Sequence, residues 1–455
     1  MAVTVPGLPF DFIQTDVAGG TVGFVFKSTA DAFYYNGTTV TKITDAQYPA
    51  TTVRGIAYLD GTYYVMDPNG QIFGSDPINS PTTWTSLNKI VAQMEPDGAV
   101  ALSRLLNYIV AFGTYTTEFF FDAGNPSPGS PLSPYTSGML NVGCAAAGSV
   151  AQTNNQLFFI GVTKQRGRSI YMLTGTTPQI ISTPAIERIL NDDDLSGVFS
   201  FCVKISGHNF YVLTLTDSNI TLACDIATGD WKEWTSLTAA ASISISTLTY
   251  DSTTGLATAT TATAHGRSDG DPVVIAGATQ TEYNGAVNVT YVDSTHFTYT
   301  PLSIPSVTPA TGTKTVVGYT SGAFIGRFYA GYGNIELVQD SAGNLYTLDP
   351  NTYQDAGLPI DVHARTPLVD GGTNQKKFFR KLEIIGDRED TLVFVRYTGD
   401  DYQTWTKYRS ADLSLRRSVL HRLGQDRRRA YELRHTDNTP LRLEALELTT
   451  EVGNN

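Results

Sequence analysis

Cysteine is nearly absent from this sequence, which has only three in 455 residues, at Cys144, Cys202 and Cys224. So few cysteines exclude the disulfide framework of a small secreted domain, and no spacing among them fits a zinc site. Cys202 and Cys224 lie in successive predicted strands and could face each other, but buried free thiols are the favoured interpretation.

Charged residues are scarce as well, at 16% of the chain, and acids exceed bases, with a formal net charge of −12 and a pI near 4.9. This charge argues against a surface that holds nucleic acid by neutralising phosphates, although DNA could still slide past it. The N-terminus, MAVTVPGLPFDFIQ, has no basic start and no continuous apolar run. We therefore expect neither a signal peptide nor a membrane span, and assembly in a cytoplasm.

Glycine, threonine, serine, asparagine, tyrosine and phenylalanine are abundant instead, which is typical of short strands and many turns and predicts an all-β fold. Aromatic pairs recur beside turn residues, as in Phe33-Tyr34-Tyr35 before Asn36-Gly37. Similar units follow at residues 56–77, 105–121, 157–181 and 199–234. Equivalent strands recur every few tens of residues, the period of β-propeller blades.

The clearest of these units runs from Phe210 to Trp234. It contains a predicted strand at 210–215, a polar turn, a second strand at 220–225, an Ala-Thr-Gly turn and a third strand with Trp231 and Trp234. Because such short connections can join only neighbouring strands, this unit predicts an antiparallel meander.

Two distant segments also match: Tyr64–Asn69 and Tyr346–Asn351 each place an aromatic residue on a strand that ends at Asp-Pro-Asn. Proline fixes such a turn and cannot donate to a strand ladder. We interpret the match as one blade hairpin used twice; the alternative is a coincidence between two ordinary turns.

Several segments that invite a chemical interpretation are better explained as structure. Asp192–Asp194 lies in the predicted short helix 185–196 without a calcium-loop pattern, so a solvated loop is favoured. His265 and Asp271 lack a nucleophile context. Residues 398–405 resemble a worn Asp-box, which is a hairpin turn and not a catalytic site. We therefore predict no catalytic, cofactor-binding or metal-binding residues.

Arginine is concentrated near the C-terminus, between Leu415 and Leu448. Arginine suits planar pairing with carboxylates as much as phosphate contact. The candidate contacts to other subunits or to an adaptor are Arg416, Arg417, Arg422, Arg427, Arg428, Arg429 and Arg434.

Three motifs, in the same order, resemble the tail nozzle family of short-tailed bacteriophages (podoviruses), also called tail hub or DNA-stabilising proteins. The family's Tyr-Asp-x-Ala-Thr-Gly-x-Trp element is matched at Cys224–Trp231, with Cys224 departing from it. Its Leu-Asp-x-x-x-Tyr-x-Asp-x-Gly-x-Pro-Ile element is matched at Leu348–Ile360, and its closing strands at Arg422–Asp437.

The resemblance implies a β-propeller with an inserted small β domain and a C-terminal β platform. Residues 242–317, poor in lysine, arginine and glutamate, resemble a small β module of phage structural proteins and interrupt the propeller signature, so we expect them to fold independently. The expected parts are an N-terminal arm that could belong to the platform (1–20), the propeller (21–241 with 318–357), the inserted module (242–317) and the platform (358–455).

The resemblance also implies a structural, non-enzymatic protein of the virion tail, assembled in the host bacterial cytoplasm as a hexameric ring around the DNA exit channel. Expected partners are further copies of the chain, the tail adaptor above, and tail fibres or needle or plug proteins. Double-stranded DNA would pass without sequence-specific binding, and no membrane or cofactor is expected. Acidic or neutral residues would line such a channel, since phosphate contacts slow DNA.

An alternative from another class stays open, namely a carbohydrate-binding or depolymerising tail propeller. The Asp-box remnant and the abundant aromatic residues favour it, but the carboxylate pair of a glycosidase cannot be recognised in the sequence. A stand-alone DNA-binding protein would need a basic groove, which the acidic composition disfavours.

Overall fold

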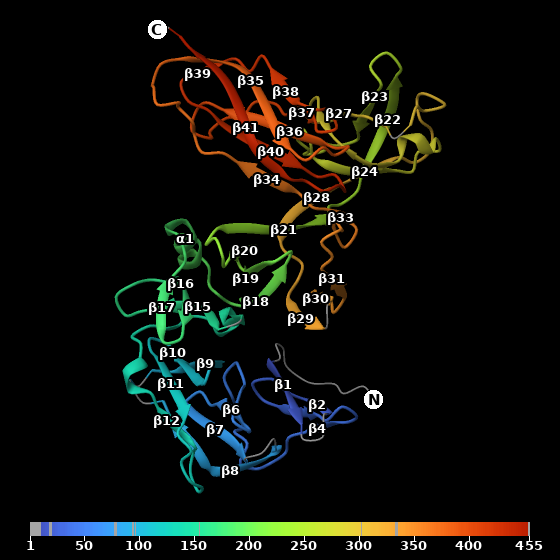
Figure 1. Cartoon of the computed structure of the whole chain (residues 1–455). Coiled ribbons are helices and arrows are strands. Elements are labelled where there is room, and N and C mark those ends of the chain that lie inside the picture. Colours follow the sequence, from blue (N-terminus) through green and yellow to red (C-terminus); the bar gives the residue numbers. More distant parts are fainter. Residues whose placement is uncertain are drawn as a thin grey trace. The chain divides into compact units, whose positions relative to one another are not determined.

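The computed structural model describes residues 11–17, 21–76, 80–92, 95, 97–153, 155–301, 303–332 and 335–453. These residues form strands and turns with a single α-helix among them, α1 (Pro184–Asp192), so the predicted all-β class is confirmed (Figure 1). The chain divides into two compact units, Met1–Trp234 with Ala323–Thr347 and Thr235–Gly322 with Leu348–Asn455. No described helix has the length and apolar character needed to span a bilayer.

Unit 1 consists of six sets of antiparallel strands that follow one another along the chain, from blue to green and then orange in Figure 1; the fifth set is part of an eleven-stranded sheet and the others are separate sheets. Five contain four or more strands and the last contains three. Their strands are β1 (Asp11–Val17), β2 (Thr21–Lys27), β3 (Ala32–Tyr35) and β4 (Val40–Lys42); β5 (Ala57–Leu59), β6 (Thr62–Met66), β7 (Gln71–Asp76) and β8 (Ser80–Val91); β9 (Ala99–Leu105), β10 (Tyr108–Gly113), β11 (Thr117–Asp122) and β12 (Leu132–Pro134); β13 (Gly143–Cys144), β14 (Ala151–Thr153), β15 (Gln156–Val162), β16 (Ser169–Thr174) and β17 (Thr177–Ile180); β18 (Phe199–Ile205), β19 (His208–Leu215), β20 (Ile220–Asp225) and β21 (Trp231–Ala239); and β29 (Phe328–Tyr332), β30 (Ile335–Gln339) and β31 (Leu345–Thr347).

These six sets of strands surround a common channel of about 1060 Å³. Its wall takes residues from the first strand of each set or from the segment beside it, including Asp11, Arg54, Leu102, Gly148, Phe199 and Arg327. First strands that face one channel are the arrangement of β-propeller blades. Short 3-10 helices η1 (Thr136–Gly138) and η2 (Ala147–Ser149) connect strands of the third and fourth blades.

Polar contacts close the seams between neighbouring blades. The Asp11 carboxylate accepts hydrogen bonds from Arg54 Nε at 2.9 Å and from the Gly55 amide at 2.7 Å, which joins the first blade to the second. Lys27 is fully buried beside this seam and donates to the Val53 carbonyl at 2.7 Å. Burial lowers the pKa of Lys27 to about 8, although Asp11 favours its charged form.

Strand β1 lies within the segment that was expected to be an N-terminal arm. Residues 11–17 pair with β2 along their whole length, so this part of the chain belongs to the first blade. Residues 1–10 and 18–20 of the expected arm lie outside the described residues.

The meander predicted at Phe210–Trp234 is confirmed. Strand β20 pairs antiparallel with β19 and with β21, with Cys224 opposite both Tyr211 and Trp231. The Tyr211 ring stacks on Phe158 at 4.9 Å, and its hydroxyl donates to the Ser149 carbonyl at 2.8 Å. The meander therefore packs directly against the fourth blade.

The cysteines are free thiols, as expected. Cys202 and Cys224 lie on β18 and β20, and Tyr211 of the intervening strand β19 separates them in register. Burial raises the pKa of Cys144 to about 12 and that of Cys224 to about 11, which keeps these thiols protonated at neutral pH.

The hypothesis of one hairpin used at Tyr64–Asn69 and at Tyr346–Asn351 is wrong. Asp67 ends β6, and its Oδ1 accepts from the Asn69 amide at 2.9 Å and the Gln71 amide at 2.8 Å. The same turn occurs at Asp340, whose Oδ1 accepts from the Ala342 and Asn344 amides at 2.9 Å each. Asp349 follows β31, the last strand of its blade. The repeated element is thus an aspartate that binds amides two and four residues later, and proline is not part of it.

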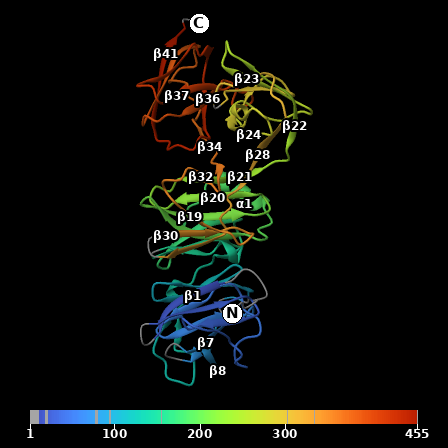
Figure 2. The same ribbon diagram turned by 90° about the vertical axis from the view of Figure 1, so that its right-hand side faces the viewer.

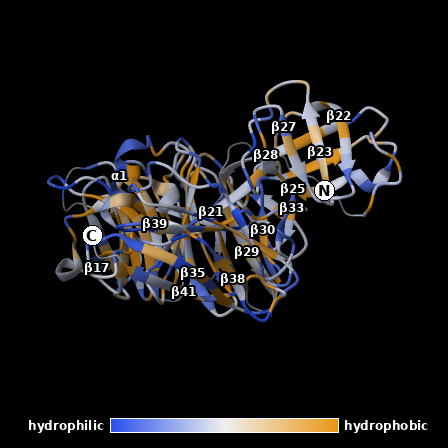
Figure 3. Ribbon diagram, turned by 90° about the horizontal axis from the view of Figure 1, so that it is seen from above, coloured by the Kyte–Doolittle hydropathy of each residue, from blue (hydrophilic) through white to orange (hydrophobic). Residues whose placement is uncertain are grey.

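Unit 2 contains the inserted module, seen in yellow-green in Figure 2. Its core residues all lie between Ile243 and Val316 and alternate along the strands, as the hydropathy colouring of Figure 3 shows for β22 and β23. The domain boundaries expected for the chain stay predictions. The elements of the module are β22 (Ile243–Asp251), β23 (Leu256–Thr261), β24 (Pro272–Ala276), η3 (Thr281–Tyr283), β25 (Gly285–Asn288), β26 (Thr290–Tyr291), β27 (His296–Tyr299) and β28 (Thr315–Ala323).

The C-terminal residues of unit 2 form two four-stranded sheets around one core. One sheet has the order β34-β40-β36-β37, and in the other β35 pairs with β38, β39 and β41. Leu382 of the second sheet and Leu433 of the first are both buried in this core. A short hairpin precedes them. The strands are β32 (Gln354–Asp355), β33 (Leu358–Pro359), β34 (Val362–Arg365), β35 (Lys377–Gly386), β36 (Leu392–Thr398), β37 (Arg409–Asp412), β38 (Ser418–His421), β39 (Gln425–Asp426), β40 (Ala430–His435) and β41 (Leu443–Val452).

Close approach of blades in unit 1 depends on Gly55. Its φ is +93°, and a Cβ built there would lie 1.7 Å from the Leu102 carbonyl oxygen of the next blade. We expect Gly55→Ala to lower the free energy of unfolding by about 3 kcal/mol or more, since both strain and a backbone clash oppose it. Gly229→Ala is the control, because Gly229 has φ +76° but no atom within 4 Å of its Cβ position. Gly229→Ala should lower the free energy of unfolding by about 1 kcal/mol. Equal losses of this free energy in the two variants, measured by urea denaturation, would contradict the role given to Gly55.

Candidate functional site

The seven candidate arginines do not form one group. Arg429 and Arg434 are buried, with 1% and 8% of their surface exposed, whereas Arg416, Arg417, Arg422, Arg427 and Arg428 are exposed. The buried pair is therefore engaged inside the chain, and the expectation of contacts with other proteins is carried by the exposed five.

Arg429 is built into the C-terminal core. Its guanidinium lies 3.9 Å from the ring centroids of both Phe379 and Tyr397. It donates to the Leu423 carbonyl at 2.7 Å and, through Nε, to Asp426 at 3.0 Å. A planar cation held between two aromatic faces and fully hydrogen-bonded stabilises the packing of these strands.

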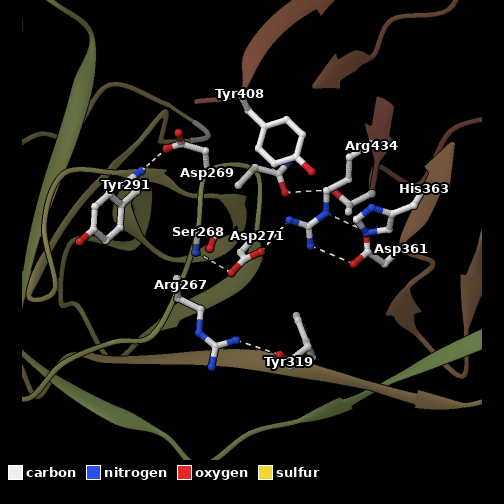
Figure 4. Close-up of polar contacts among 12 residues, drawn as sticks. Arg267, Ser268, Asp269, Asp271, Tyr291, Tyr319, Asp361, His363, Tyr408 and Arg434 are labelled. Atoms are coloured by element: carbon white, nitrogen blue, oxygen red, sulfur yellow. Dashed lines mark hydrogen bonds and ion pairs between the residues drawn. The ribbon is translucent and has the colours of Figure 1, made fainter. Parts of the chain in front are cut away.

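Arg434 connects the C-terminal sheets to the inserted module (Figure 4). Its Nε and one terminal nitrogen donate to the two oxygens of Asp361 at 2.8 and 2.9 Å. The other terminal nitrogen donates to Asp271 of the module at 2.6 Å, across 163 residues of sequence. Nearby, Asn288 of the module donates to Asp437 at 3.1 Å. The module is thus attached to the C-terminal sheets by the single ion-pair contact of Arg434 with Asp271 and by the hydrogen bond from Asn288 to Asp437, whereas the bidentate pair with Asp361 orients Arg434 from outside the module.

His265, considered with Asp271 as a pair in the sequence, is structural. It is 2% exposed, and its two ring nitrogens contact the Asp293 carbonyl at 2.8 Å and the Arg267 amide at 3.0 Å. Asp271 is bound instead by Arg434 and by the Ser268 amide at 2.7 Å. Neither residue is available for catalysis.

Glu432, two residues before Arg434 on β40, is fully buried and receives several donors. Arg396 donates to it at 2.7 Å, and Arg365 and the Tyr408 hydroxyl also bind it. Burial alone would raise the pKa of Glu432, but these partners and His363 hold it well below its usual range. A carboxylate saturated with donors in this way cannot serve as a general acid or base.

His363 lies beside both carboxylates, 3.0 Å from Asp361 and 3.7 Å from Glu432. Burial lowers its pKa, but the hydrogen bonds to these carboxylates outweigh burial and raise the pKa to about 9. The same contacts, with Arg434, keep the pKa of Asp361 below its usual value despite burial. His363 is therefore a cation at neutral pH and part of the cluster.

Alternation along β40 is the sequence signal that could have found this cluster. Tyr431 and Leu433 enter the apolar core, while Glu432 and Arg434 occupy the opposite face of the same strand. Two charged residues on one face of an otherwise apolar strand predict buried ion pairs, since buried charges need partners.

The exposed arginines have few partners of their own. Arg428 pairs with Asp401, and Arg417 lies 3.3 Å from Glu383. Arg427 donates to the Asn374 carbonyl at 2.9 Å, which leaves its charge unneutralised. Within the described ranges, the side chains of Arg416 and Arg422 make no hydrogen bond or ion pair.

Charge is divided unevenly along the chain. Residues 358–455 contain 17 of the 31 lysines and arginines and 15 of the 43 acids, a net charge of +2. Residues 1–357 contain the other 14 bases and 28 acids, a net charge of −14. The exposed arginines thus lie on the one basic part of an acidic protein.

Of the three aspartates expected in a solvated loop, Asp192 and Asp194 are exposed and Asp193 differs. Asp193 is 2% exposed; its Oδ1 accepts from the Leu195 amide at 2.7 Å and its Oδ2 from the Ser218 amide at 2.9 Å. Asp193, Asp194 and Asp217 have carboxylate oxygens within 4.8 Å of one another. The hydrogen bonds from these two amides explain Asp193 as a turn residue that connects the end of α1 to the turn between β19 and β20.

The worn Asp-box is a closed hairpin turn between β36 and β37, as expected. Asp400 Oδ1 accepts from the Thr404 amide at 2.9 Å and from the Thr398 hydroxyl at 2.7 Å. The Thr404 hydroxyl also donates to Asp400 Oδ2, and this hydrogen bond, with those from the Thr404 amide and the Thr398 hydroxyl, lowers the pKa of Asp400 to about 2. The carboxylate is therefore occupied by the turn itself.

The blades around one channel define a β-propeller protein whose charged clusters hold structure together. Over residues 19–254 the chain matches the family described as bacteriophage P22 Gp10, β-propeller, and it belongs to that family. No curated protein matches its sequence.

Similar solved structures share little sequence with the chain. The computationally designed Ika8 protein has 9% identity and a TM-score of 0.33, over 71% of this chain and 80% of its own. BamB from Moraxella catarrhalis has 10% identity and a TM-score of 0.32, over 76% of this chain and 99% of its own. Such low scores assign no function.

The Arg434 bridge predicts how the module is held. Asp271→Asn should speed hydrogen exchange of the amides at residues 268–271 and 288–290 by about tenfold or more, because the module loses its charged contact. Arg434→Met should in addition lower the free energy of unfolding by about 3 kcal/mol, since Asp361 loses both hydrogen bonds from Arg434 and keeps only the contact with His363. Arg442→Met is the control, as Arg442 is 72% exposed and 3.8 Å from Asp387; it should cost less than about 1 kcal/mol. Unchanged exchange in Asp271→Asn would refute the bridge.

The raised pKa of His363 predicts a pH dependence of stability. A pKa of about 9 in the folded state, against an ordinary value of 6.5, means that the contribution of His363 is complete below about pH 6.5. It should be lost as the pH rises through about 9. We expect His363→Gln to flatten the decline of the melting temperature between these pH values, whereas His421→Gln, at an exposed position, should leave it unchanged. Identical pH profiles for wild type and His363→Gln would contradict the assignment.

Proposed function

We propose that this chain is a structural protein of a bacteriophage tail and forms the tail nozzle of a short-tailed phage. In this role copies of the chain assemble as a hexameric ring around the DNA exit channel, retain the genome in the virion and conduct it at ejection. The observation that carries the proposal is the family match over residues 19–254. The nozzle motifs in the sequence at Leu348–Ile360 and Arg422–Asp437 support it beyond the matched range.

The division of charge supports assembly with other chains. Exposed arginines on the basic residues 358–455 can pair with carboxylates of the acidic remainder of a neighbouring copy, or with a tail adaptor above the ring. Such pairs give orientation as well as attraction. Tail fibres and needle or plug proteins are the further partners of this proposal, and the host cytoplasm is its place of assembly.

The acidic part of the chain suits a channel for DNA. Each phosphate contact with a basic residue adds a salt-sensitive attraction that would slow DNA in transit. With a net charge of −14, residues 1–357 can supply acidic or neutral walls past which DNA slides without sequence-specific binding.

The proposed role requires no chemistry. Asp271 and Asp400, which sequence patterns bring to attention, and Glu432, which the structure reveals, are each occupied by donors. This occupation also weakens the alternative of a carbohydrate-degrading propeller, because Asp400 of the Asp-box remnant serves its own turn. Reducing ends released from host polysaccharide by the purified protein, and abolished by one carboxylate substitution, would favour that alternative.

The assembly itself is testable. We expect the purified chain to form closed rings by mass photometry and negative-stain electron microscopy. Arg427→Glu with Arg428→Glu should abolish rings while the circular dichroism spectrum is retained, because both side chains are exposed. Lys204→Glu with Lys232→Glu is the control, an equal change of charge at exposed positions of unit 1. A wild-type chain that stays monomeric at every concentration would contradict the nozzle proposal. Normal rings in the arginine variant, with altered DNA retention, would instead assign these arginines to the channel.

A further inference from the structure

A small pocket of about 220 Å³ opens among the C-terminal strands. It lies where the end of β35 and the loop after it meet the segment between β37 and β38. Its apolar lining includes Ile384, Ile385 and Leu413, and Leu415 beside it is 54% exposed. Three arginines also line it, namely Arg388, Arg416 and Arg417.

Two of these arginines, Arg388 and Arg416, carry charge that no acid of the described residues neutralises. Arg388 donates through two nitrogens to the Ser414 carbonyl, at 2.7 and 3.1 Å, which orients the guanidinium without cancelling its charge. Arg416 has no hydrogen bond or ion pair to any residue that the structure describes. The rim of the pocket therefore has one cation, Arg388, held in place by a carbonyl, and a second, Arg416, without a partner among the described residues.

The acids that line the pocket have other cations. Glu383 lies 3.3 Å from Arg417, which is 69% exposed, but it pairs more closely with Lys381 at 2.7 Å. Asp387 lies 3.8 Å from Arg442. The rim is thus left with an excess of positive charge around an exposed leucine. Arginine beside a partly buried apolar side chain is the composition of protein interface hot spots.

We propose that this pocket seats an acidic segment from residues 1–357 of a second copy of the chain. The inference rests on the proposed ring, and it names the surface that joins one subunit to the next. Charge complementarity favours a second copy, because residues 358–455, which contain the pocket, have a net charge of +2 and residues 1–357 have a net charge of −14. A segment with a carboxylate and a neighbouring apolar side chain satisfies the arginines and covers Leu415 together. A DNA phosphate would satisfy only the arginines and leave Leu415 exposed.

Arg416→Glu with Arg417→Glu tests this contact. We expect the concentration needed for half-assembly of rings to rise by about 30-fold or more, and Leu415→Ala to raise it by about tenfold. The melting temperature should stay near that of wild type, because all three side chains are exposed and Glu383 keeps Lys381. Arg416→Gln with Arg417→Gln is a second variant, which keeps the test decisive if the glutamates prevent folding. Lys204→Glu with Lys232→Glu is the matched control and should assemble as wild type does.

The outcomes separate this inference from the nozzle proposal. Rings that form equally well in wild type and in both double variants of Arg416 and Arg417 would overturn the inference and leave the nozzle proposal standing. A wild-type chain that never assembles would overturn both. Rings that persist while binding of a short DNA duplex, followed by gel mobility, is lost would reassign the pocket to phosphate. Loss of rings in the arginine variants and in Leu415→Ala, with the control unaffected, supports the second copy.

Discussion

Unit 2 depends on two opposite charges on one face of a buried strand, each of which is paired with residues from other parts of the chain. Glu432 and Arg434 stand two residues apart on β40, and neither can stay in the interior without partners. Arg365, Arg396, Tyr408 and His363 surround the first, and Asp361 with Asp271 bind the second. These ion pairs and hydrogen bonds hold β34, β36 and the residue before β37 against β40. Through Asp271 they also hold a loop of the inserted module.

The burial of some of these charges divides the C-terminal arginines into two groups. Arginines that look equivalent in the sequence differ in the structure: Arg429 and Arg434 are buried and complete the fold, and the other five candidates are exposed. This difference agrees with the physical properties of the guanidinium, which can be buried when planar partners saturate it, as in Arg429 and Arg434. The basic surface of an acidic protein is thus a small set of side chains, and the pocket beside Leu415 is where apolar surface accompanies them.

Unit 1 obeys a different constraint, the close approach of blades around one channel. Asp11 holds the first seam through Arg54 and the Gly55 amide, and Gly55 itself allows a backbone approach to Leu102 that no side chain would permit. Aspartate turns at Asp67 and Asp340 repeat in separate blades and end their strands with the same amide contacts. These features hold the blades and their turns together and occupy the carboxylates of Asp11, Asp67 and Asp340, which suits a structural role in a phage tail.

Local patterns in the sequence were sufficient for everything that depends on neighbours in the chain. The all-β class, the meander at Phe210–Trp234 and the turn at Asp400 follow from alternation and turn residues within a few positions. Long-range decisions belonged to the tertiary structure alone. Only packing shows that Asp193 is buried and that Arg434 pairs with Asp271 across 163 residues. A short-range pattern specifies a hairpin because its contacts are close in sequence, whereas the partner of a buried charge is chosen by which distant strand lies against it.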